Sequence, residues 1–578
     1  MLKMIYNLRP YSKKANKWLI LNILTSLIGN ILVLISPLLI GFAVNHIIGL
    51  NQVDFIYVTK ILTIVAGLYI FGTTLIWISQ FCSHNYATII VKNMRNEAFN
   101  ITVNTPISFL DKNLTGDIMM RFSQDSDLVF DALSHFFMQF FQGVATIVIS
   151  LALMIYLNIW LTLVVLATVP IILVYSKLTK AKGNQRFIQS QRLTGELSSK
   201  SVEYIAEKKL ITAYNYEQNV KDEFDQINQN LSEVATKAYF LASINNPTYR
   251  LINNIAYAFL GLVSLVLYQI GKPVEISVLT SMIMYAAMFS RPFNEFSVLT
   301  ANFMAGKAGL RRVLDILIQD KEEENKPFNK KDRATQGEVI FHNVQFSYTK
   351  GKELIKDFSL QVKPGQKVAI VGPTGAGKST LINLLMRFYD VNSGTIILDG
   401  KDIKDYNRKA LRLSFGLVLQ EPWLFNGTIE QNLKYGKKNA TDAEMIEAAK
   451  KANCHGFISK LKDGYKTVLS EKVNLSVGQK QLLTIARALI INPPILILDE
   501  ATSNIDSLME QQIQEAFMKV MENRTSFVIA HRLKTITDSN VIIVMNQGSI
   551  EELGTHQELM EKKGFYYDLY MSQFSNEN

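Results

Sequence analysis

Hydrophobic positions are unevenly distributed along this chain of 578 residues. The first ~320 residues contain long apolar runs, whereas the remainder has the shorter apolar and polar segments typical of a soluble α/β protein. A helix needs about 20 residues to cross the hydrocarbon core of a membrane. Six segments meet this length and are expected to be membrane-spanning helices: 18–43, 56–82, 133–157, 159–178, 248–270 and 276–304.

The connections between these segments alternate in charge. The N-terminal segment and two long connections are rich in lysine and arginine, whereas the other connections carry at most one such residue, Lys272. The positive-inside rule therefore predicts that the N-terminus, both long connections and the C-terminal half lie on the cytoplasmic side of the cytoplasmic membrane. The net charge of +10 is then explained by a membrane surface rather than by nucleic acid. The first apolar segment is too long for a signal peptide and is expected to be retained.

The two long connections also have helical periodicity. At 1.5 Å per residue, a pair of helices of about 25 residues reaches about 35 Å below the membrane. Loops of this length usually have a function. A solvated helical hairpin is one interpretation, and a lever that contacts a cytoplasmic domain is the other.

A charged segment divides the chain. Residues 319–336 are expected to form an exposed, uncompacted linker, after which alternation typical of β-strands begins. We therefore predict a six-helix membrane domain at 1–318 and a cytoplasmic α/β nucleotide-binding domain at 337–578. The two cysteines, Cys82 and Cys454, have no spacing typical of a disulfide scaffold or a zinc site.

A phosphate-binding loop is the strongest local motif. It follows an apolar strand at 368–371 and precedes a helical run at 381–388, which is the context that such a loop requires. Its glycines let backbone N–H groups surround the phosphates, Lys378 would reach the β- and γ-phosphates, and Ser379 would bind Mg²⁺. The motif comprises Gly372, Pro373, Thr374, Gly375, Ala376, Gly377, Lys378, Ser379 and Thr380.

Two adjacent carboxylates follow a second apolar run, Ile495–Leu498. This pattern predicts a buried parallel strand that delivers acids to its C-terminal edge. Asp499 suits the metal through its bound water, and Glu500 suits general-base catalysis on the attacking water. Such a strand end is often only a polar cap, but the phosphate-binding loop upstream favours the catalytic interpretation.

The segment Leu-Ser-Val-Gly-Gln precedes a predicted helix from about Gln479 to Ile491. Ser476 and Gly478 there offer a hydroxyl, N–H groups and the positive end of a helix dipole to an anion. A helix start without a ligand would explain this segment alone but not the other motifs. Together, the three motifs resemble those of the ATP-binding cassette (ABC) transporters, specifically the exporters that fuse six spans to one cassette.

The resemblance covers nearly the whole chain and implies a dimeric site. In the family, the signature segment, here including Ser476, Gly478 and Gln479, closes on the γ-phosphate held by the phosphate-binding loop of the other subunit. Tyr348 resembles the aromatic residue that stacks on adenine. Gln420 resembles the glutamine that contacts both Mg²⁺ and the levers of the membrane domain.

Two further polar residues match the family. Asp506 resembles the loop acid that crosses the dimer interface, and His531 resembles the histidine that contacts the γ-phosphate and orients the base. In the membrane half, residues 109–117 and 204–217 resemble the two inner-loop signatures. The cofactors implied are ATP and Mg²⁺.

The chain departs from the common family pattern in the signature segment and just before the loop acid Asp506. Val477 stands where glycine is usual, and Asn504 and Ile505 stand where Ala-Leu is usual. Exporters built from two different chains often have one subunit with an intact base and switch histidine but an altered signature. Because this chain combines an intact Glu500 and His531 with the unusual Val477 and Asn504, we favour a heterodimer and keep a homodimer as the alternative.

The expected function is ATP-driven export of a hydrophobic or amphipathic substrate by alternating access, with the drug, lipid or peptide class open. An ATP-gated channel or receptor is disfavoured by Glu500, because a gate needs little turnover. Soluble ATPases of the family lack spans, and importers usually keep the two parts on separate chains.

Charged and aromatic residues within the spans are candidates for a substrate cavity. Arg291 and Glu295 lie in the sixth segment, but Arg291 is better explained by snorkelling to the inner headgroups. The third segment contains Phe136, Phe137, Phe140 and Phe141, for which lipid contact or core packing is the preferred interpretation.

Overall fold

The computed structural model describes residues 2–47, 53–322, 326–329, 332–349, 351–469, 475–499, 507–530 and 533–574. They form two compact units. The N-terminal unit comprises Met1–Asn104 and Asn113–Gln319, and the C-terminal unit comprises Thr105–Lys112 and Asp320–Asn578. The short segment Thr105–Lys112 therefore groups with the C-terminal unit, although it lies within the helical half of the sequence.

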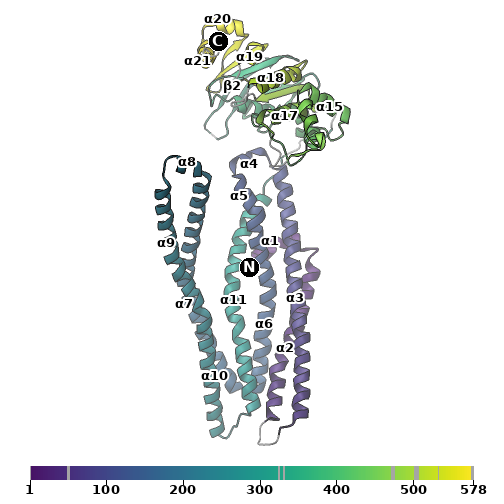
Figure 1. The fold of residues 1–578 in the computed structure, drawn as a ribbon. Coiled ribbons are helices and arrows are strands. Elements are labelled where there is room, and N and C mark those ends of the chain that lie inside the picture. Colours follow the sequence, from purple (N-terminus) through teal and green to yellow (C-terminus); the bar gives the residue numbers. More distant parts are fainter. Residues whose placement is uncertain are drawn as a thin grey trace. The chain divides into compact units, whose positions relative to one another are not determined.

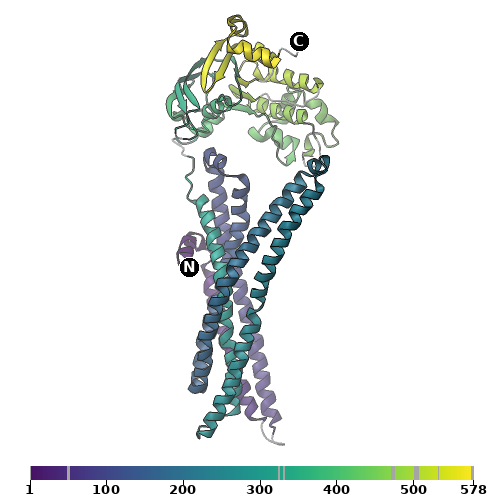
Figure 2. The same ribbon diagram turned by 90° about the vertical axis from the view of Figure 1, so that its left-hand side faces the viewer.

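The described part of the N-terminal unit is helical, with no strand (Figure 1). Its helices are α1 (Leu2–Ser12), α2 (Asn16–Asn45), α3 (Phe55–Asn104), α5 (Thr115–Met120), the π-helix η1 (Arg121–Asp125), α6 (Ser126–Leu157), α7 (Ile159–Ala206), α8 (Lys208–Ala213), α9 (Glu217–Ser243), α10 (Asn245–Gln269) and α11 (Ile276–Leu317). The hairpin formed by α7 and α9, which join through α8, diverges from the other helices in both views (Figures 1 and 2).

Five helical stretches among the described residues are long and apolar enough to cross a membrane. They are Asn16–Asn45, Phe55–Asn104, Thr115–Leu157, Ile159–Thr179 and Glu217–Gln269, and each contains or overlaps one predicted span. The sixth predicted span lies on α11, which does not reach the same hydropathy. Arg291, Pro292 and Glu295 lower the apolar character of α11, and the two charged side chains form an ion pair of 2.7 Å.

Close contacts between α2 and α3 depend on small residues. A side-chain carbon on Gly29 would lie 2.9 Å from the carbonyl oxygen of Gly72, so neither position has room for a larger residue. About two turns away, seven residues along each helix, the Asn22 amide donates hydrogen bonds to the Ser79 backbone oxygen (2.7 Å) and Oγ (2.9 Å). Small residues and interhelical hydrogen bonds are the usual means by which helices associate in lipid.

Among the phenylalanines of the third predicted span, Phe136 and Phe140 pack against α11, and Phe137 packs against Tyr86 of α3. Phe136 is 5 % exposed and its ring centroid lies 6.2 Å from that of Phe303, and Phe140 lies 6.0 Å from Phe296. Gly143 admits this contact, because a side-chain carbon there would lie 2.7 Å from the Phe296 ring. The packing interpretation of Phe136 and Phe140 is therefore confirmed.

The C-terminal unit is an α/β structure with three sheets, which confirms the predicted fold class. The strands are β1 (Val339–Phe346), β2 (Ile355–Val362), β3 (Lys367–Val371), β4 (Ser393–Leu398), β5 (Lys401–Asp402), β6 (Phe415–Val418), β7 (Gly427–Thr428), β8 (Val468–Leu469), β9 (Ile495–Asp499), β10 (Thr525–Ile529), β11 (Val541–Asn546) and β12 (Ser549–Gly554). The largest sheet has the order β12-β11-β3-β10-β9-β6, and the second sheet has the order β2-β1-β4-β5.

Two hydrophobic core clusters of buried side chains lie in this unit, which also contains the following helices. They are α4 (Ile107–Lys112), α12 (Lys378–Leu385), η3 (Ile403–Asp405), α13 (Arg408–Arg412), α14 (Ile429–Leu433), η4 (Lys434–Gly436), α15 (Asp442–Lys451), α16 (His455–Lys460), η5 (Gly464–Lys466), α17 (Val477–Ile491), α18 (Ser507–Met521), α19 (Leu533–Thr537), α20 (His556–Lys562) and α21 (Phe565–Phe574).

Most described residues of the linker predicted at 319–336 are exposed, as expected, but the segment is not uncompacted at Glu322 and Lys326. Glu322 binds Arg412 through two hydrogen bonds of 2.6 and 2.8 Å and also lies 3.2 Å from Arg408. Further along, the Asn407 amide donates to the backbone oxygen of Lys326 at 2.7 Å. Charge composition predicted solvent exposure, but the arginines of α13 supply specific partners that hold the segment against the C-terminal unit.

We predict that Glu322→Ala lowers the thermal unfolding midpoint of the protein by about 2–4 °C, which corresponds to about 1 kcal/mol for a unit of this size. The change leaves the partly buried Arg412 guanidinium without its carboxylate, whereas Arg408 keeps its ion pair with Asp390 at 2.7 Å. The loss of a partly buried pair costs more than the loss of an exposed pair. Differential scanning fluorimetry of the full chain in detergent measures the midpoint. Glu353→Ala, at an exposed position, is the control and should leave it unchanged. Equal midpoints for both variants would contradict the prediction.

Candidate functional site

Five parallel strands, β11, β3, β10, β9 and β6, present their carboxyl ends at one edge of the large sheet. β10 pairs with β3 and β9, and β6 pairs with β9, all in parallel. Ile529 of β10 is in register with both Ile370 and Asp499, so the ends of β3 and β9 lie at the same level. With about 4.8 Å between neighbouring strands, they are separated by about 10 Å. Gln420 follows β6 by two residues, so the phosphate-binding loop, Asp499 and Gln420 all emerge at this edge.

The loop between β3 and α12 requires glycine at specific positions. Gly372 has φ +151°, and a side-chain carbon there would lie 2.2 Å from the carbonyl oxygen of Met545 in β11. Gly377 has φ +99° at the start of α12, and a side-chain carbon there would lie 2.8 Å from Ile355. The loop is therefore pressed against the sheet, and the unpaired N–H groups of the first turn of α12 are available to an anion.

Lys378, the first residue of α12, turns back over this loop. Its ammonium donates to the carbonyl oxygens of Gly372 (2.7 Å) and Pro373 (3.0 Å). Burial lowers the pKa of Lys378, and the nearby carboxylate of Asp499 partly opposes this effect. The loop cation and the acid at the end of β9 thus act on each other electrostatically, as expected for two groups that face the same ligand.

Tyr348 lies beside the first turns of α12. Its hydroxyl donates to Thr380 Oγ1 at 3.3 Å and accepts from the Asn383 amide at 3.2 Å. The edges of Phe346 and Tyr389 pack against it with ring centroids 4.9 Å away, yet the side chain remains 43 % exposed. An aromatic ring held in this way next to a phosphate-binding loop has a surface available for stacking.

The signature segment forms the start of α17. Ser476 and Gln479 form a capping box in which the Gln479 N–H donates to Ser476 Oγ (3.2 Å) and the Ser476 N–H donates to Gln479 Oε1 (3.1 Å). Gly478 is buried, whereas Val477 is 55 % exposed. Valine is therefore compatible with the fold of this chain, and its effect is limited to whatever approaches this helix end from outside.

Three predicted site residues lie outside the described residues: Glu500, Asp506 and His531. In the sequence, Glu500 follows the last residue of β9, Asp506 precedes the first residue of α18, and His531 comes two residues after the end of β10. Their roles remain predictions.

Sequence reasoning missed Tyr389. Its hydroxyl donates to the carboxylate of Asp111 in α4 at 2.5 Å, and its ring contacts Tyr348. Burial, with the hydrogen bond to Asp111 and the negative charge there adding to it, raises the pKa of Tyr389. The sequence offered only the aromatic pair Phe388 and Tyr389 after α12, and such a pair usually indicates core packing. α4 contains the first part of the segment 109–117, which resembles an inner-loop signature, and Asp111 in this segment contacts the aromatic cluster through Tyr389.

The carboxyl edge of the sheet offers a small set of side-chain donors for a metal ion. Among the described residues, no group of three or more His, Cys, Asp or Glu side chains lies close enough to hold a metal ion. Ser379, Gln420 and Asp499 supply instead one hydroxyl, one amide and one carboxylate. This small oxygen donor set fits Mg²⁺, which is usually bound by one or two protein groups together with substrate phosphates.

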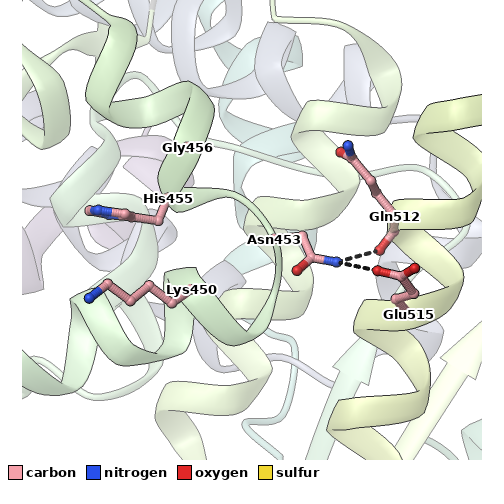
Figure 3. A pocket seen from close by; sticks show the side chains of 6 residues that line it. All are labelled: Lys450, Asn453, His455, Gly456, Gln512 and Glu515. Carbon is pink, nitrogen blue, oxygen red and sulfur yellow. Dashed lines mark hydrogen bonds between the residues drawn. The ribbon is translucent and has the colours of Figure 1, made fainter.

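A separate hollow of about 420 Å³ lies among α15, α16 and α18, lined by Lys450, Asn453, His455, Gly456, Gln512 and Glu515 (Figure 3). The Asn453 amide donates to the Gln512 backbone oxygen (3.2 Å) and to Glu515 (3.3 Å), and the His455 ring bonds the Tyr465 hydroxyl at 2.8 Å. These polar groups hold the helices together and contain none of the nucleotide motifs.

Comparisons with known proteins match both halves of the chain. Residues 19–293 match the family model described as the ABC transporter transmembrane region, and residues 355–503 match the model described as ABC transporter. The chain is 36 % identical to the uncharacterized ABC transporter ATP-binding protein YfiC of Bacillus subtilis, over 98 % of this chain and 93 % of that protein.

Two further similarities concern exporters and lipids. A fatty acid ABC transporter ATP-binding/permease protein of Mycobacterium bovis is 34 % identical, over 89 % of this chain and 82 % of its own length. A solved structure of a bacterial Atm1-family ABC exporter with ATP bound is 26 % identical, has a TM-score of 0.78 and covers 97 % of this chain and 98 % of its own.

We predict that Gly372→Ala lowers ATP affinity at least about tenfold, because the new methyl group displaces the loop whose N–H groups hold the phosphates. Binding of a fluorescent ATP analogue measures the effect. Gly400→Ala is the control, since Gly400 also has positive φ but has open space where the methyl group would lie. The two variants share the backbone strain, so a similar loss of affinity in both would contradict the steric explanation.

Proposed function

The chain belongs to the ABC transporter family, and we propose that it is one half of a dimeric exporter that moves an amphipathic, lipid-like substrate across the cytoplasmic membrane. It couples an ATPase unit to a membrane unit within one polypeptide. The observation that carries the proposal is the convergence of the phosphate-binding loop, Asp499 and Gln420 at one sheet edge, next to the exposed ring of Tyr348. A lipid-like substrate is supported by the similarity to the mycobacterial fatty acid transporter.

In the proposed ATPase site, the adenine ring stacks on Tyr348 and the phosphates lie on the N–H groups that precede and begin α12. Lys378 leaves its carbonyl partners for the β- and γ-phosphates, which explains why its ammonium is held only by backbone oxygens of the loop. The partner chain closes the site with its own Ser476, Gly478, Gln479 and Asp506. The residues assigned to loop contacts are Gly372, Pro373, Thr374, Gly375, Ala376, Gly377, Lys378, Ser379 and Thr380.

Three side chains would hold Mg²⁺: Ser379, Gln420 and Asp499. The ion supplies positive charge that neutralises the phosphates during hydrolysis. Glu500 accepts a proton from the attacking water, and His531 orients Glu500 and contacts the γ-phosphate. In the sequence, the proposed base Glu500 directly follows Asp499, the last residue of β9.

The contact between Tyr389 and Asp111 is the proposed link between nucleotide and membrane unit. Tyr389 packs against the ring proposed to stack on adenine, and its hydroxyl binds the first inner loop. A nucleotide that repositions Tyr348 therefore changes the surroundings of α4 through one intermediate side chain. This arrangement supports the lever interpretation of the first long connection.

The dimer is proposed to contain two different chains. Val477 replaces a glycine at the helix end that approaches the partner's nucleotide, and its exposed side chain adds bulk there. The predicted base and switch histidine, Glu500 and His531, are present in this chain. Hydrolysis is then concentrated in the site that uses this chain's base and the partner's signature.

We predict that Tyr389→Phe weakens coupling while ATP affinity stays within about twofold. The variant loses a hydrogen bond to a carboxylate, an interaction whose contribution is about 1.5–3 kcal/mol. Coupling is measured as the ATP-induced distance change between spin labels attached to the Thr115→Cys variant in the two chains of a dimer. Cys82 and Cys454 are buried and do not compete for the label. Tyr567→Phe is the matched control on α21, and an unchanged distance response in Tyr389→Phe would refute the proposed link.

We further predict that this chain, purified alone in lipid nanodiscs, hydrolyses ATP slowly and that a second exporter chain restores turnover. Glu500→Gln is the blank and should abolish the restored activity. Robust hydrolysis by the chain alone, abolished by Glu500→Gln, would establish a homodimer and contradict the unequal pair. No hydrolysis under any pairing by folded protein would contradict the ATPase assignment itself.

A further inference from the structure

Two adjoining hollows lie at the cytoplasmic end of α3, in the N-terminal unit. The first, of about 750 Å³, is lined by Pro10, Tyr11, Lys13, Lys14, Asn93, Asn96, Glu97 and Asn100. The second, of about 330 Å³, is lined by Thr88, Val91, Lys92, Arg95, Asn96, Asp127 and Phe130. Asn96 belongs to both, so the two hollows meet on α3.

Positive charge exceeds negative charge in this lining. Four cationic side chains face two carboxylates, Glu97 and Asp127. Arg95 uses one Nη to bind Asp127 at 2.6 Å, and its buried Nε has no hydrogen-bond partner among the described residues. Lys13, Lys14 and Lys92 form no ion pair in the described part of the chain. The hollows therefore present free donors and uncompensated positive charge.

The same face of α3 becomes apolar toward the membrane. Positions 77, 81, 88, 92 and 96 recur at intervals of four or seven residues and so lie on one face of the helix. On its outer part, Trp77 and Phe81 are 67 % and 55 % exposed, whereas Thr88, Lys92 and Asn96 follow on the cytoplasmic part. An exposed apolar stripe that ends at a basic hollow matches the shape of a lipid with acyl chains and an anionic headgroup.

The position of Trp18 supports headgroup depth for the hollows. Trp18 begins the apolar part of α2 and packs edge-on against Phe81 at 6.0 Å, and the ammonium of Lys17 lies 5.7 Å from its ring. Tryptophan is enriched at the membrane–water interface. Lys13 and Lys14 precede it by about one helical turn, and the Asn93 amide fixes this segment to α3 through the Tyr11 carbonyl at 3.1 Å.

We propose that the hollows on either side of Asn96 form a binding site for an anionic phospholipid of the inner leaflet. The lipid phosphate lies between Lys13, Lys14 and the amides of Asn93 and Asn96, and Lys92 and Arg95 contact the rest of the headgroup. The acyl chains follow the apolar stripe of α3. The inner-leaflet assignment rests on the membrane orientation proposed above, but the chemistry of the site does not depend on transport.

The test is native mass spectrometry of the full-length dimer in detergent, titrated with phosphatidylglycerol or phosphatidylcholine in the absence of ATP. Each lysine near an anionic lipid contributes about 1 kcal/mol. Lys13→Gln with Lys14→Gln should therefore weaken phosphatidylglycerol binding at least about tenfold and leave phosphatidylcholine binding unchanged. The near-isosteric Asn96→Asp, which adds a negative charge shared by both hollows, should weaken phosphatidylglycerol binding as well.

Lys221→Gln with Lys237→Gln is the control, since it removes the same charge from exposed positions on α9 and should bind phosphatidylglycerol normally. Equal binding of the two lipids by the unmodified dimer, or unchanged phosphatidylglycerol binding in both site variants, would overturn the proposal. Competition by soluble glycerophosphoglycerol at the concentration of the lipid would assign the site to a soluble phosphate instead and would overturn it too. Because the readout involves neither ATP nor transport, failure here is distinct from failure of the proposed export function.

Discussion

The C-terminal unit depends on the complete burial of three neighbouring parallel strands, β3, β10 and β9. The apolar side chains of β3 and β9 from Val368 to Val371 and from Ile495 to Leu498 are nearly inaccessible to solvent. Strands buried on both faces cannot accept polar residues except where they end. Polar and charged groups are thus confined to one edge, and the sheet register brings the end of β3 level with Asp499. The phosphate-binding loop and Asp499 therefore lie close together because polar residues are excluded from the buried strands, and not because the polar groups attract one another.

Much of this unit was predictable because its signals are local. A strand, a glycine-rich turn and a helix follow one another within about 20 residues, and a run of four apolar residues ends in acids. Parallel pairing then orders the strand ends, so the convergence of the loop, Asp499 and Gln420 followed from topology. The long apolar helices were predictable for a similar reason, since hydropathy is summed over each segment by itself. Tyr348 was placed only by resemblance to a family, because an isolated tyrosine carries no such signal.

The failures concern contacts between segments far apart in the sequence. Glu322 was assigned to an uncompacted linker because its neighbours are charged, and its partners on α13 lie about 90 residues later. Tyr389 contacts Asp111 across 278 positions, and neither residue indicates the other. Composition describes how a segment meets solvent, but it does not identify a specific partner.

The aromatic cluster of Phe346, Tyr348 and Tyr389 has an evolutionary consequence. One ring faces the position proposed for the nucleobase, and its neighbour holds the carboxylate of α4. A substitution of Tyr348 that changes which nucleobase is preferred also alters the packing of Tyr389. A substitution in α4 that removes the contact with Tyr389 alters the same group of rings. The preference for one nucleobase and the proposed coupling through α4 therefore depend on the same side chains. Selection on either property is expected to leave compensating changes that affect the other.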